Sequence, residues 1–297
     1  MIHIRIEQTA PRLGCLAENL EKHCDCIAQA TAEGVNLLIF PELSLTGYLL
    51  KDLVPEVALS VDGLIAELGK RLDGIQNFET VIGFVEETPG HRFYNSAAFL
   101  RWDPQGMLEA VHVHRKIYLP TYGLFDEGRY FSQGRTARTF DSKFLGRCGL
   151  LICEDAWHLS VPLLLALDGP NQEGAGTFIV ISNSPARGIG GETQGVPESL
   201  QTWENLLRTY ACLLESMVIY ANRGGVEDGL TFSGGSQMVA AGGKPLARAD
   251  LFSPDTLDYT LDWPEDLRSS RLGSLVIANE NADFLRRELD RILRSSI

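Results

Sequence analysis

The sequence contains no arrangement of cysteines typical of a disulfide framework or a zinc site. Its 297 residues include six cysteines, which are scattered without a repeated C-x-x-C pair or a zinc-type spacing to histidine. Free thiols in a long acidic chain are typical of the reducing cytoplasm, which is the location we expect. No stretch approaches the roughly 18 apolar residues of a membrane span, and the N-terminus lacks the apolar core of a signal peptide.

Basic residues are also in short supply. Lysine and arginine number 26 against 39 aspartates and glutamates, which gives a formal net charge of −13 at pH 7. Nucleic acids and anionic membranes bind basic patches, so we expect neither as a partner. The sequence contains no linker, low-complexity tract or internal repeat either, and we therefore predict a single domain over residues 1–297.

Alternating and wholly apolar segments predict an α/β protein. Residues 2–6 alternate as in a strand, a helix of mixed pattern follows over 13–33, and residues 35–40 are apolar at every position except Asn36. This β-α-β order, with strands apolar on both faces, is typical of sheets covered by helices. Further strands are predicted at 80–85, 95–100, 148–152, 177–182, 217–221 and 237–240, and helices at 61–72, 157–167 and 202–216.

The last predicted element is an amphipathic helix from Asp283 to Arg294. Its apolar face carries Phe284, Leu285, Leu289, Ile292 and Leu293. Such a face covers either the helix's own domain or a neighbouring molecule. We therefore expect residues 275–297 to be a C-terminal segment that can pack on a partner subunit.

Three chemically active side chains follow predicted strands: Glu42, Lys116 and Cys153. Each also has an ordinary interpretation, as a solvated loop carboxylate, an exposed surface charge and a small core residue. If the strands end at one side of a sheet, however, the three side chains form a base, a cation and a nucleophile. A carboxylate can take the thiol proton, and an ammonium group can stabilise the oxyanion of a tetrahedral intermediate.

Other polar groups lie close to these strand ends. The segment from Asn183 to Arg187 follows the strand at 177–182, a position where ligands bind in open α/β sheets. The helix expected from Trp157 begins near Cys153, and its N-terminus would favour a thiolate. The loop at 121–131 combines aromatic and charged residues, a composition typical of functional loops.

Three segments resemble the nitrilase or carbon–nitrogen hydrolase superfamily. They are Phe40-Pro-Glu-Leu-Ser-Leu-Thr-Gly-Tyr48, His114-Arg-Lys116 with Leu119-Pro120, and Ile152-Cys-Glu-Asp155, in the order that the family has. The resemblance implies a four-layer α-β-β-α sandwich, a homodimer or higher homo-oligomer, and a site without metal or cofactor. It also implies that Glu42 is the general base, Lys116 the transition-state stabiliser and Cys153 the nucleophile. Glu127 resembles the second glutamate of the family, which orients the lysine and the substrate or water.

The local likeness is strongest to the glutaminase domain of glutamine-dependent NAD synthetases. It rests on Leu45-Thr-Gly-Tyr48 with Lys51-Asp-Leu53 and on the segments at 119–131 and 153–157. It implies a carboxamide pocket lined by Tyr122, Glu154, Trp157 and Ser184. The family arginine that holds the glutamine carboxylate is displaced in this sequence, and Arg187 is the residue that can replace it. An ATP pyrophosphate-binding loop does not follow the domain, so we expect a stand-alone hydrolase of a small carboxamide.

Other functions remain open at this point. One is a glutaminase subunit that feeds ammonia to a separate synthetase, and others are a nitrilase or a carbamoylase. A non-catalytic scaffold of the same fold is a further alternative. Alkylation by iodoacetamide at neutral pH would separate an enzyme from a scaffold, because a low-pKa thiol at Cys153 should react well before Cys15, Cys24 or Cys26.

Overall fold

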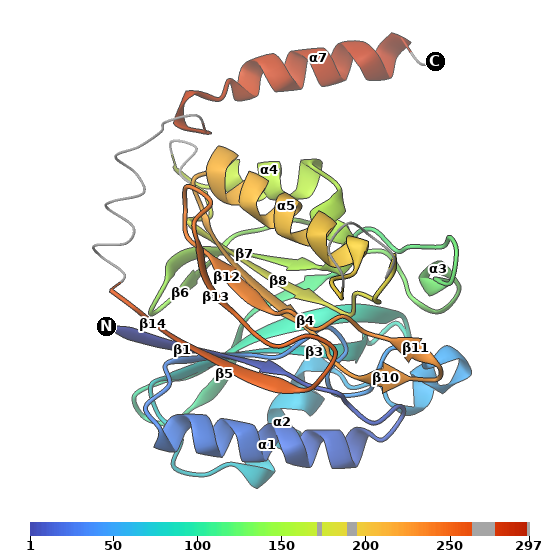
Figure 1. Ribbon diagram of the computed structural model, residues 1–297, viewed down its shortest axis with the longest axis vertical. Coiled ribbons are helices and arrows are strands. Elements are labelled where there is room, and N and C mark those ends of the chain that lie inside the picture. Colours follow the sequence, from blue (N-terminus) through green and yellow to red (C-terminus); the bar gives the residue numbers. More distant parts are fainter. Residues whose placement is uncertain (171–173, 189–194, 263–276, 296–297) are drawn as a thin grey trace.

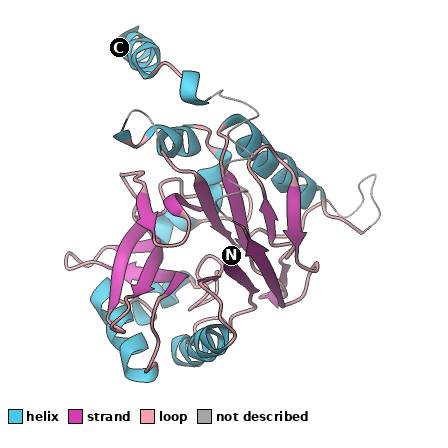
Figure 2. Ribbon diagram, turned by 90° about the vertical axis from the view of Figure 1, so that its left-hand side faces the viewer, coloured by secondary structure: helices cyan, strands magenta, loops and turns pink. Residues whose placement is uncertain are grey.

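Two sheets of six strands each form the centre of the protein, of which the computed structural model describes residues 1–170, 174–188, 195–262 and 277–295. Figure 2 shows the two sheets as separate groups of strands. In order across the first sheet, the strands are β14 (Asp255–Leu261), β1 (Ile2–Gln8), β2 (Leu37–Ile39), β3 (Phe78–Glu87), β4 (Phe93–Trp102) and β5 (Leu108–Arg115). In order across the second, they are β13 (Pro245–Arg248), β12 (Gln237–Val239), β9 (Met217–Asn222), β8 (Thr177–Ser182), β7 (Gly146–Ile152) and β6 (Phe140–Ser142).

Helices cover the outer face of each sheet, as Figure 1 shows. On the first sheet lie α1 (Leu16–Ala32) and α2 (Val61–Arg71), and on the second lie α4 (Ser160–Leu167) and α5 (Glu198–Leu213). Helix α1 buries Leu20, Cys24 and Ile27, whose spacing of four and three residues places them on one helical face. The prediction of a four-layer α-β-β-α sandwich is therefore confirmed.

The space between the sheets is filled by apolar side chains from both. Residues that alternate along β1, such as Ile4 and Ile6, meet Leu150 and Ile152 of β7 and Ile179 of β8 in one buried cluster. Successive side chains of a strand point to opposite faces, so the intervening residues of the same strands pack under the helices. Because both faces of these strands are buried, their sequences are almost continuously apolar.

Strand directions bring the chemically active residues to one edge. β2 runs parallel to β3, and β5 runs the same way because both neighbouring pairs, β3–β4 and β4–β5, are antiparallel. The residues that follow β2 and β5 therefore leave the first sheet at the same edge. In the second sheet β7, β8 and β9 are parallel, so the residues after each of them also gather at one edge.

Short elements complete the chain. They are the hairpin of β10 (Val226–Glu227) and β11 (Leu230–Thr231), the helix α3 (Glu127–Tyr130), and the 3₁₀ turns η1 (Lys51–Glu56), η2 (Cys153–Trp157) and η4 (Ile277–Asn279). The helix predicted from residue 157 begins only at Ser160, because the chain after Cys153 first forms η2. Strand β14 was not predicted from the sequence, since it is an edge strand with a mostly polar sequence that pairs with β1.

The C-terminal helix α7 (Ala282–Ser295) has no buried residue. Figure 1 shows it apart from the helical layers. Its side chains Phe284, Leu289, Ile292 and Leu293 are exposed, which agrees with the amphipathic pattern of the sequence. Part of the segment predicted at 275–297 lies outside the described residues. Within the described ranges, no helix is both long and apolar enough to span a membrane.

Candidate active site

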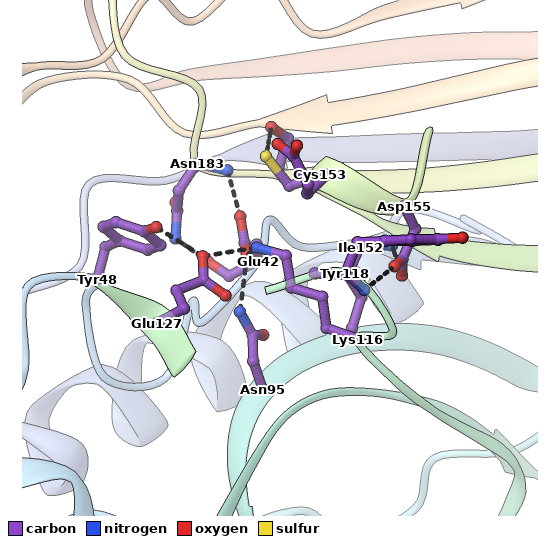
Figure 3. A network of polar contacts seen from close by, with 12 residues as sticks. Glu42, Tyr48, Asn95, Lys116, Tyr118, Glu127, Ile152, Cys153, Asp155 and Asn183 are labelled. Carbon is purple, nitrogen blue, oxygen red and sulfur yellow. Dashed lines mark hydrogen bonds and ion pairs between the residues drawn. The ribbon is translucent and has the colours of Figure 1, made fainter. Parts of the chain in front are cut away.

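The three strand-end residues gather between the two sheets, and Figure 3 shows them together with Glu127. Glu42 follows β2 and Lys116 follows β5, so both come from the first sheet, whereas Cys153 follows β7 in the second. Glu127 is the first residue of α3 and lies in the loop after Lys116. Glu42, Lys116 and Glu127 are each at most 4% exposed, which excludes the interpretation of Glu42 and Lys116 as solvated surface charges.

Both carboxylate oxygens of Glu42 accept hydrogen bonds. Oε1 accepts from Lys116 Nζ and from Asn95 Nδ2, each at 2.7 Å. Oε2 accepts from the backbone N–H of Asn183 at 2.7 Å, and the side chain of Asn183 in turn donates to the backbone carbonyl of Glu42 at 2.8 Å. These contacts fix the orientation of the carboxylate.

Lys116 lies between two carboxylates. Its Nζ is 2.7 Å from Glu42 Oε1 and 2.7 Å from Glu127 Oε1. Burial by itself would lower the pKa of Lys116, but the charges of Glu127 and Glu42 raise that pKa well above its ordinary value. The lysine is therefore a cation at neutral pH and can act as a fixed positive charge.

Glu127 is held through one oxygen only. Its Oε1 accepts from Tyr48 Oη at 2.6 Å as well as from Lys116, while its buried Oε2 has no hydrogen-bond partner among the residues that the structure describes. Burial raises the pKa of Glu127 to about 7, although the charge of Lys116 works in the opposite direction. The charge of this carboxyl group is thus sensitive to pH near neutrality.

Cys153 occupies a strained position at the end of β7. Its φ of 44° lies in the left-handed region that side-chain-bearing residues rarely adopt, a type of strain that is concentrated at functional sites. Its Sγ accepts a hydrogen bond from Ser182 Oγ at 3.3 Å. Burial, followed by the negative charge of Glu42, raises the pKa of the thiol. The expectation of a low-pKa thiol favoured by a helix N-terminus is therefore wrong for the resting site, where only the five-residue η2 begins at Cys153.

Asp155 links the elements that carry Lys116 and Cys153. Its Oδ1 accepts from the backbone N–H groups of Ile117 and Tyr118 at 2.9 and 3.0 Å. Its Oδ2 contacts His114 Nε2 at 2.8 Å and accepts from the backbone N–H of Ile152 at 3.2 Å. A single buried carboxylate thus ties the end of β5 to the end of β7.

A cavity of about 170 Å³ opens onto Cys153. All five predicted substrate-binding residues line it, and the complete lining is Tyr122, Phe125, Cys153, Glu154, Trp157, Ser184, Pro185, Arg187, Ser199 and Trp203. The structure thus brings these residues together with the thiol. A roomier cavity of about 470 Å³ lies between α1 and the ends of β1 and β14, and no member of the Glu42–Lys116–Cys153 set lines it.

The cavity wall carries one charge of each sign. The Arg187 guanidinium lies over the ring of Phe125, with its carbon 4.9 Å from the ring centre. The Glu154 carboxylate accepts hydrogen bonds from Tyr122 Oη at 2.9 and 3.0 Å, and His158 lies 3.6 Å from it. Arg187 can therefore meet a carboxylate of a ligand, and Glu154 an ammonium group.

The sequence did not indicate the roles of several residues. Asn95 binds the side chain of Glu42, Tyr48 binds that of Glu127, and Asp155 binds backbone N–H groups next to Lys116 and Cys153. The sequence offered no reason to select these three residues beyond their place in or near the family segments. Asn183 was expected to face a ligand and instead binds Glu42. In the part of the chain that the structure describes, no group of three or more histidine, cysteine or acidic side chains could hold a metal ion.

Comparison with known proteins gives a consistent result. The family model described as carbon–nitrogen hydrolase matches residues 4–266. A glutamine-dependent NAD(+) synthetase from Synechocystis is 30% identical over 94% of this chain and 50% of that protein. The structure of a glutamine-dependent NAD+ synthetase from Acinetobacter baumannii superposes with a TM-score of 0.74 at 28% identity, covering 89% of this chain and 46% of that one. The chain therefore spans about half the length of these relatives.

The fold also matches shorter proteins along their whole length. A carbon–nitrogen hydrolase from Helicobacter pylori G27 superposes with a TM-score of 0.79 at 22% identity, covering 97% of this chain and 98% of that one. At this level of identity the match concerns the fold alone.

Proposed function

The chain belongs to the carbon–nitrogen hydrolase family, and on that premise we propose that it hydrolyses a small carboxamide to ammonia and a carboxylic acid through a thioester on Cys153. The observation that carries the proposal is the buried contact of Lys116 with both Glu42 and Glu127 beside a cavity that opens onto Cys153. A base, a fixed cation and a nucleophile in one enclosed site are what acyl transfer from an amide requires.

In the first half-reaction, Glu42 takes the proton of the Cys153 thiol as Sγ attacks the carboxamide carbon. The raised pKa of the thiol makes this base necessary, because little thiolate exists in the resting site. The carbonyl oxygen becomes an oxyanion, which Lys116 and a backbone N–H near residue 154 stabilise. The C–N bond then breaks, Glu42 returns its proton to the leaving nitrogen, and ammonia departs.

In the second half-reaction, Glu42 takes a proton from water, and the resulting hydroxide attacks the thioester carbon. The C–S bond breaks, the carboxylic acid leaves, and the thiolate recovers a proton from Glu42. Lys116 remains charged throughout because its pKa is raised well above the ordinary value. Glu127 keeps the lysine in place and contributes its own charge when it is ionised.

We further propose that the substrate carries charged groups at the end remote from the carboxamide, as glutamine does. Arg187 and Glu154 supply one positive and one negative charge on the cavity wall, and a zwitterionic α-amino acid end would satisfy both. The likeness to glutamine-dependent synthetases supports the same substrate class. It also favours one second candidate function, a glutaminase that delivers ammonia to a separate synthetase.

Ammonia release from a panel of compounds tests the proposal. The panel holds glutamine, asparagine, short aliphatic amides, ω-amidodicarboxylates, a nitrile and an N-carbamoyl amino acid, each with the wild-type protein and with Cys153→Ala. Release from one carboxamide that disappears in Cys153→Ala is the expected result. Release that survives the substitution would contradict the mechanism, and release from the nitrile or carbamoyl compound alone would contradict the substrate class.

A further inference from the structure

Glu227, at the end of β10, has its side chain in the loop that carries Glu42. The residue is 6% exposed. Its Oε1 accepts from the backbone N–H groups of Tyr48 and Leu49 at 2.9 and 2.8 Å. Its Oε2 accepts from Arg223 Nη1 at 2.6 Å, and Arg223 is itself fully buried. Glu227 thus joins two segments that lie almost 180 residues apart in the sequence.

The approach of Glu227 to this loop is close. Gly47 has a φ of 81°, and a Cβ atom at that position would lie 2.5 Å from Glu227 Oε2. The loop therefore needs glycine both for its backbone conformation and for room beside the carboxylate. Apart from the turn at its start, residues 42–50 form no helix or strand, so the contacts of Glu227 replace the hydrogen bonds of regular structure.

The tyrosine held in this way reaches the active site. Tyr48 Oη donates to Glu127 Oε1 at 2.6 Å, and the same oxygen accepts from Lys116 Nζ at 2.7 Å. The Tyr48 ring packs edge-on against Phe232, over whose ring the Arg223 guanidinium lies at 4.2 Å. A continuous chain of contacts therefore runs from the Arg223–Glu227 ion pair through Tyr48 to the catalytic lysine.

Glu127 depends on this chain because its hydrogen bonds come from one side. The tyrosine hydroxyl and Lys116 both bind Oε1, while Oε2 is buried and has no partner within the described part of the chain. Without the hydroxyl, Lys116 alone would fix the carboxylate, and the lysine also serves Glu42.

We propose that Glu227 is a positioning residue for amide hydrolysis, which fixes Tyr48 so that the tyrosine hydroxyl holds Glu127 against Lys116. This inference rests on the proposed function, but it concerns a residue that does not touch the cavity around Cys153. On this proposal, the buried Arg223–Glu227 pair affects the rate of amide hydrolysis as well as the stability of the fold.

The proposal predicts a change in pH dependence. Four groups on different elements face the Glu127 carboxyl: Lys116 after β5, Glu42 after β2, Tyr48 in the loop, and Cys153 at the start of η2. The hydrogen bond from Tyr48 favours the ionised form of Glu127, so its loss raises the pKa of Glu127 above the value of about 7. In a plot of activity against pH, the inflection caused by the titration of Glu127 should therefore move to higher pH.

The experiment compares Glu227→Gln, Tyr48→Phe and the double variant with the wild-type protein. In Glu227→Gln one side-chain oxygen becomes an NH₂ group, which must face either Arg223 or the backbone donors of the loop. The readouts are kcat/KM for the accepted amide against pH and the rate of Cys153 alkylation by iodoacetamide against pH. The matched control is Glu79→Gln, a buried carboxylate paired with Arg101 at the opposite end of the first sheet.

We expect both single variants to lose about 10- to 100-fold in kcat/KM, the loss typical of a hydrogen bond to a charged group. In both, the inflection near neutral pH that reports Glu127 should move to higher pH. We expect the double variant to lose no more than Tyr48→Phe alone, because both substitutions break one chain of contacts. Glu79→Gln should lower the melting temperature without moving either pH profile.

Three outcomes would overturn the proposal. The first is an unchanged pH profile in a folded Glu227→Gln variant. The second is a loss of kcat/KM in the double variant that equals the product of the two single losses. The third is an equal shift of the inflection in Glu79→Gln. If Glu227→Gln does not fold, Glu227→Asp takes its place, and Tyr48→Phe must still shift the profile. If the wild-type protein hydrolyses no amide, the proposed function fails, whereas the alkylation profile of Cys153 still tests the positioning role separately.

Discussion

The ammonium group of Lys116 lies 2.7 Å from the carboxylate of Glu42, and neither side chain has any surface exposed to solvent. A buried ion pair of this kind contributes little net stability, since the desolvation of both charges offsets their attraction. It does keep the lysine charged and the carboxylate oriented. The pair is therefore explained better by the proposed chemistry than by a contribution to stability.

Replacing Lys116 by methionine should be costly to stability as well as to activity. The substitution leaves the buried carboxylates of Glu42 and Glu127 without their cation, and breaking a buried pair in this way costs about 3–5 kcal/mol. One carboxyl group will take up a proton to relieve the repulsion, so the loss of unfolding free energy should be larger at pH 8 than at pH 5. Urea unfolding at both pH values measures this difference.

The matched control for this prediction is Lys22→Met. Lys22 is exposed and pairs with Glu18 at 2.9 Å on the surface of α1, a solvent-screened contact that contributes little to stability. Equal losses of stability in the two variants, or a loss in Lys116→Met that is independent of pH, would contradict the account of a buried cation between two carboxylates.

Glu42→Gln should reduce turnover by about 10²- to 10⁴-fold, the contribution typical of a general base. The variant has the same shape, but both oxygens of Glu42 accept hydrogen bonds from the protein. The new NH₂ group must face one of these donors, so some stability is lost as well. Single-turnover kinetics should show the slow step in thioester formation, and retention of more than a tenth of wild-type turnover would rule out Glu42 as the base.

Arg187→Ala should change the choice of substrate and leave the chemical steps intact. We expect KM for glutamine to rise about 10- to 100-fold, because a charge-assisted contact with its carboxylate is lost. The kcat/KM for a short neutral amide, which has no group to meet the arginine, should change less than threefold by the same argument. Steady-state kinetics with the two substrates provides the test, and equal effects on both would exclude a carboxylate-binding role for Arg187.

His112→Phe should stabilise the protein in acid. The ring of His112 stacks on Phe140 at 4.8 Å between centres, and its buried Nε2 has no hydrogen-bond partner in the described ranges. Burial lowers the pKa of His112 to about 4 from an ordinary 6.5, so the unfolded chain binds more protons than the folded one between these values. Stability from this residue is therefore present above pH 6.5 and is lost as the pH falls toward 4.

Phenylalanine keeps the stacking and removes the proton-binding site. The gain in unfolding free energy relative to wild type should be about 1–2 kcal/mol larger at pH 5 than at pH 7. Thermal or urea unfolding at the two pH values measures it, with activity as a check that the site is undisturbed. A gain that is the same at both pH values would show that His112 titrates normally.

The sequence predicted the parts of this structure that depend on short segments. Apolar runs such as 148–152 and 177–182 became the buried strands β7 and β8, because a strand with both faces covered must be apolar throughout. Glu42 and Cys153 could be selected because each follows such a strand, and Lys116 because it follows the alternating strand β5. The directions of the parallel strands then explain why they meet at one edge.

The sequence could not supply the contacts that depend on distant segments. Glu227 binds the loop at Tyr48, and β14 pairs with β1 at the other end of the chain, although neither segment has a local pattern that announces its partner. The direction of the Cys153 pKa was also missed. A helix N-terminus was expected to favour the thiolate, whereas the burial of the thiol and the nearby charge of Glu42 favour the protonated form.

The most direct test of the central claim is mass spectrometry of the enzyme quenched in acid during turnover of its best amide. The account predicts that the peptide containing Cys153 gains the mass of the acyl group, that the adduct is lost on treatment with hydroxylamine, and that Cys153→Ala shows neither the adduct nor ammonia release. A variant Cys212→Ala, which removes an exposed cysteine, should keep both. Ammonia release by Cys153→Ala, or turnover with the acyl group on a different residue, would contradict the account.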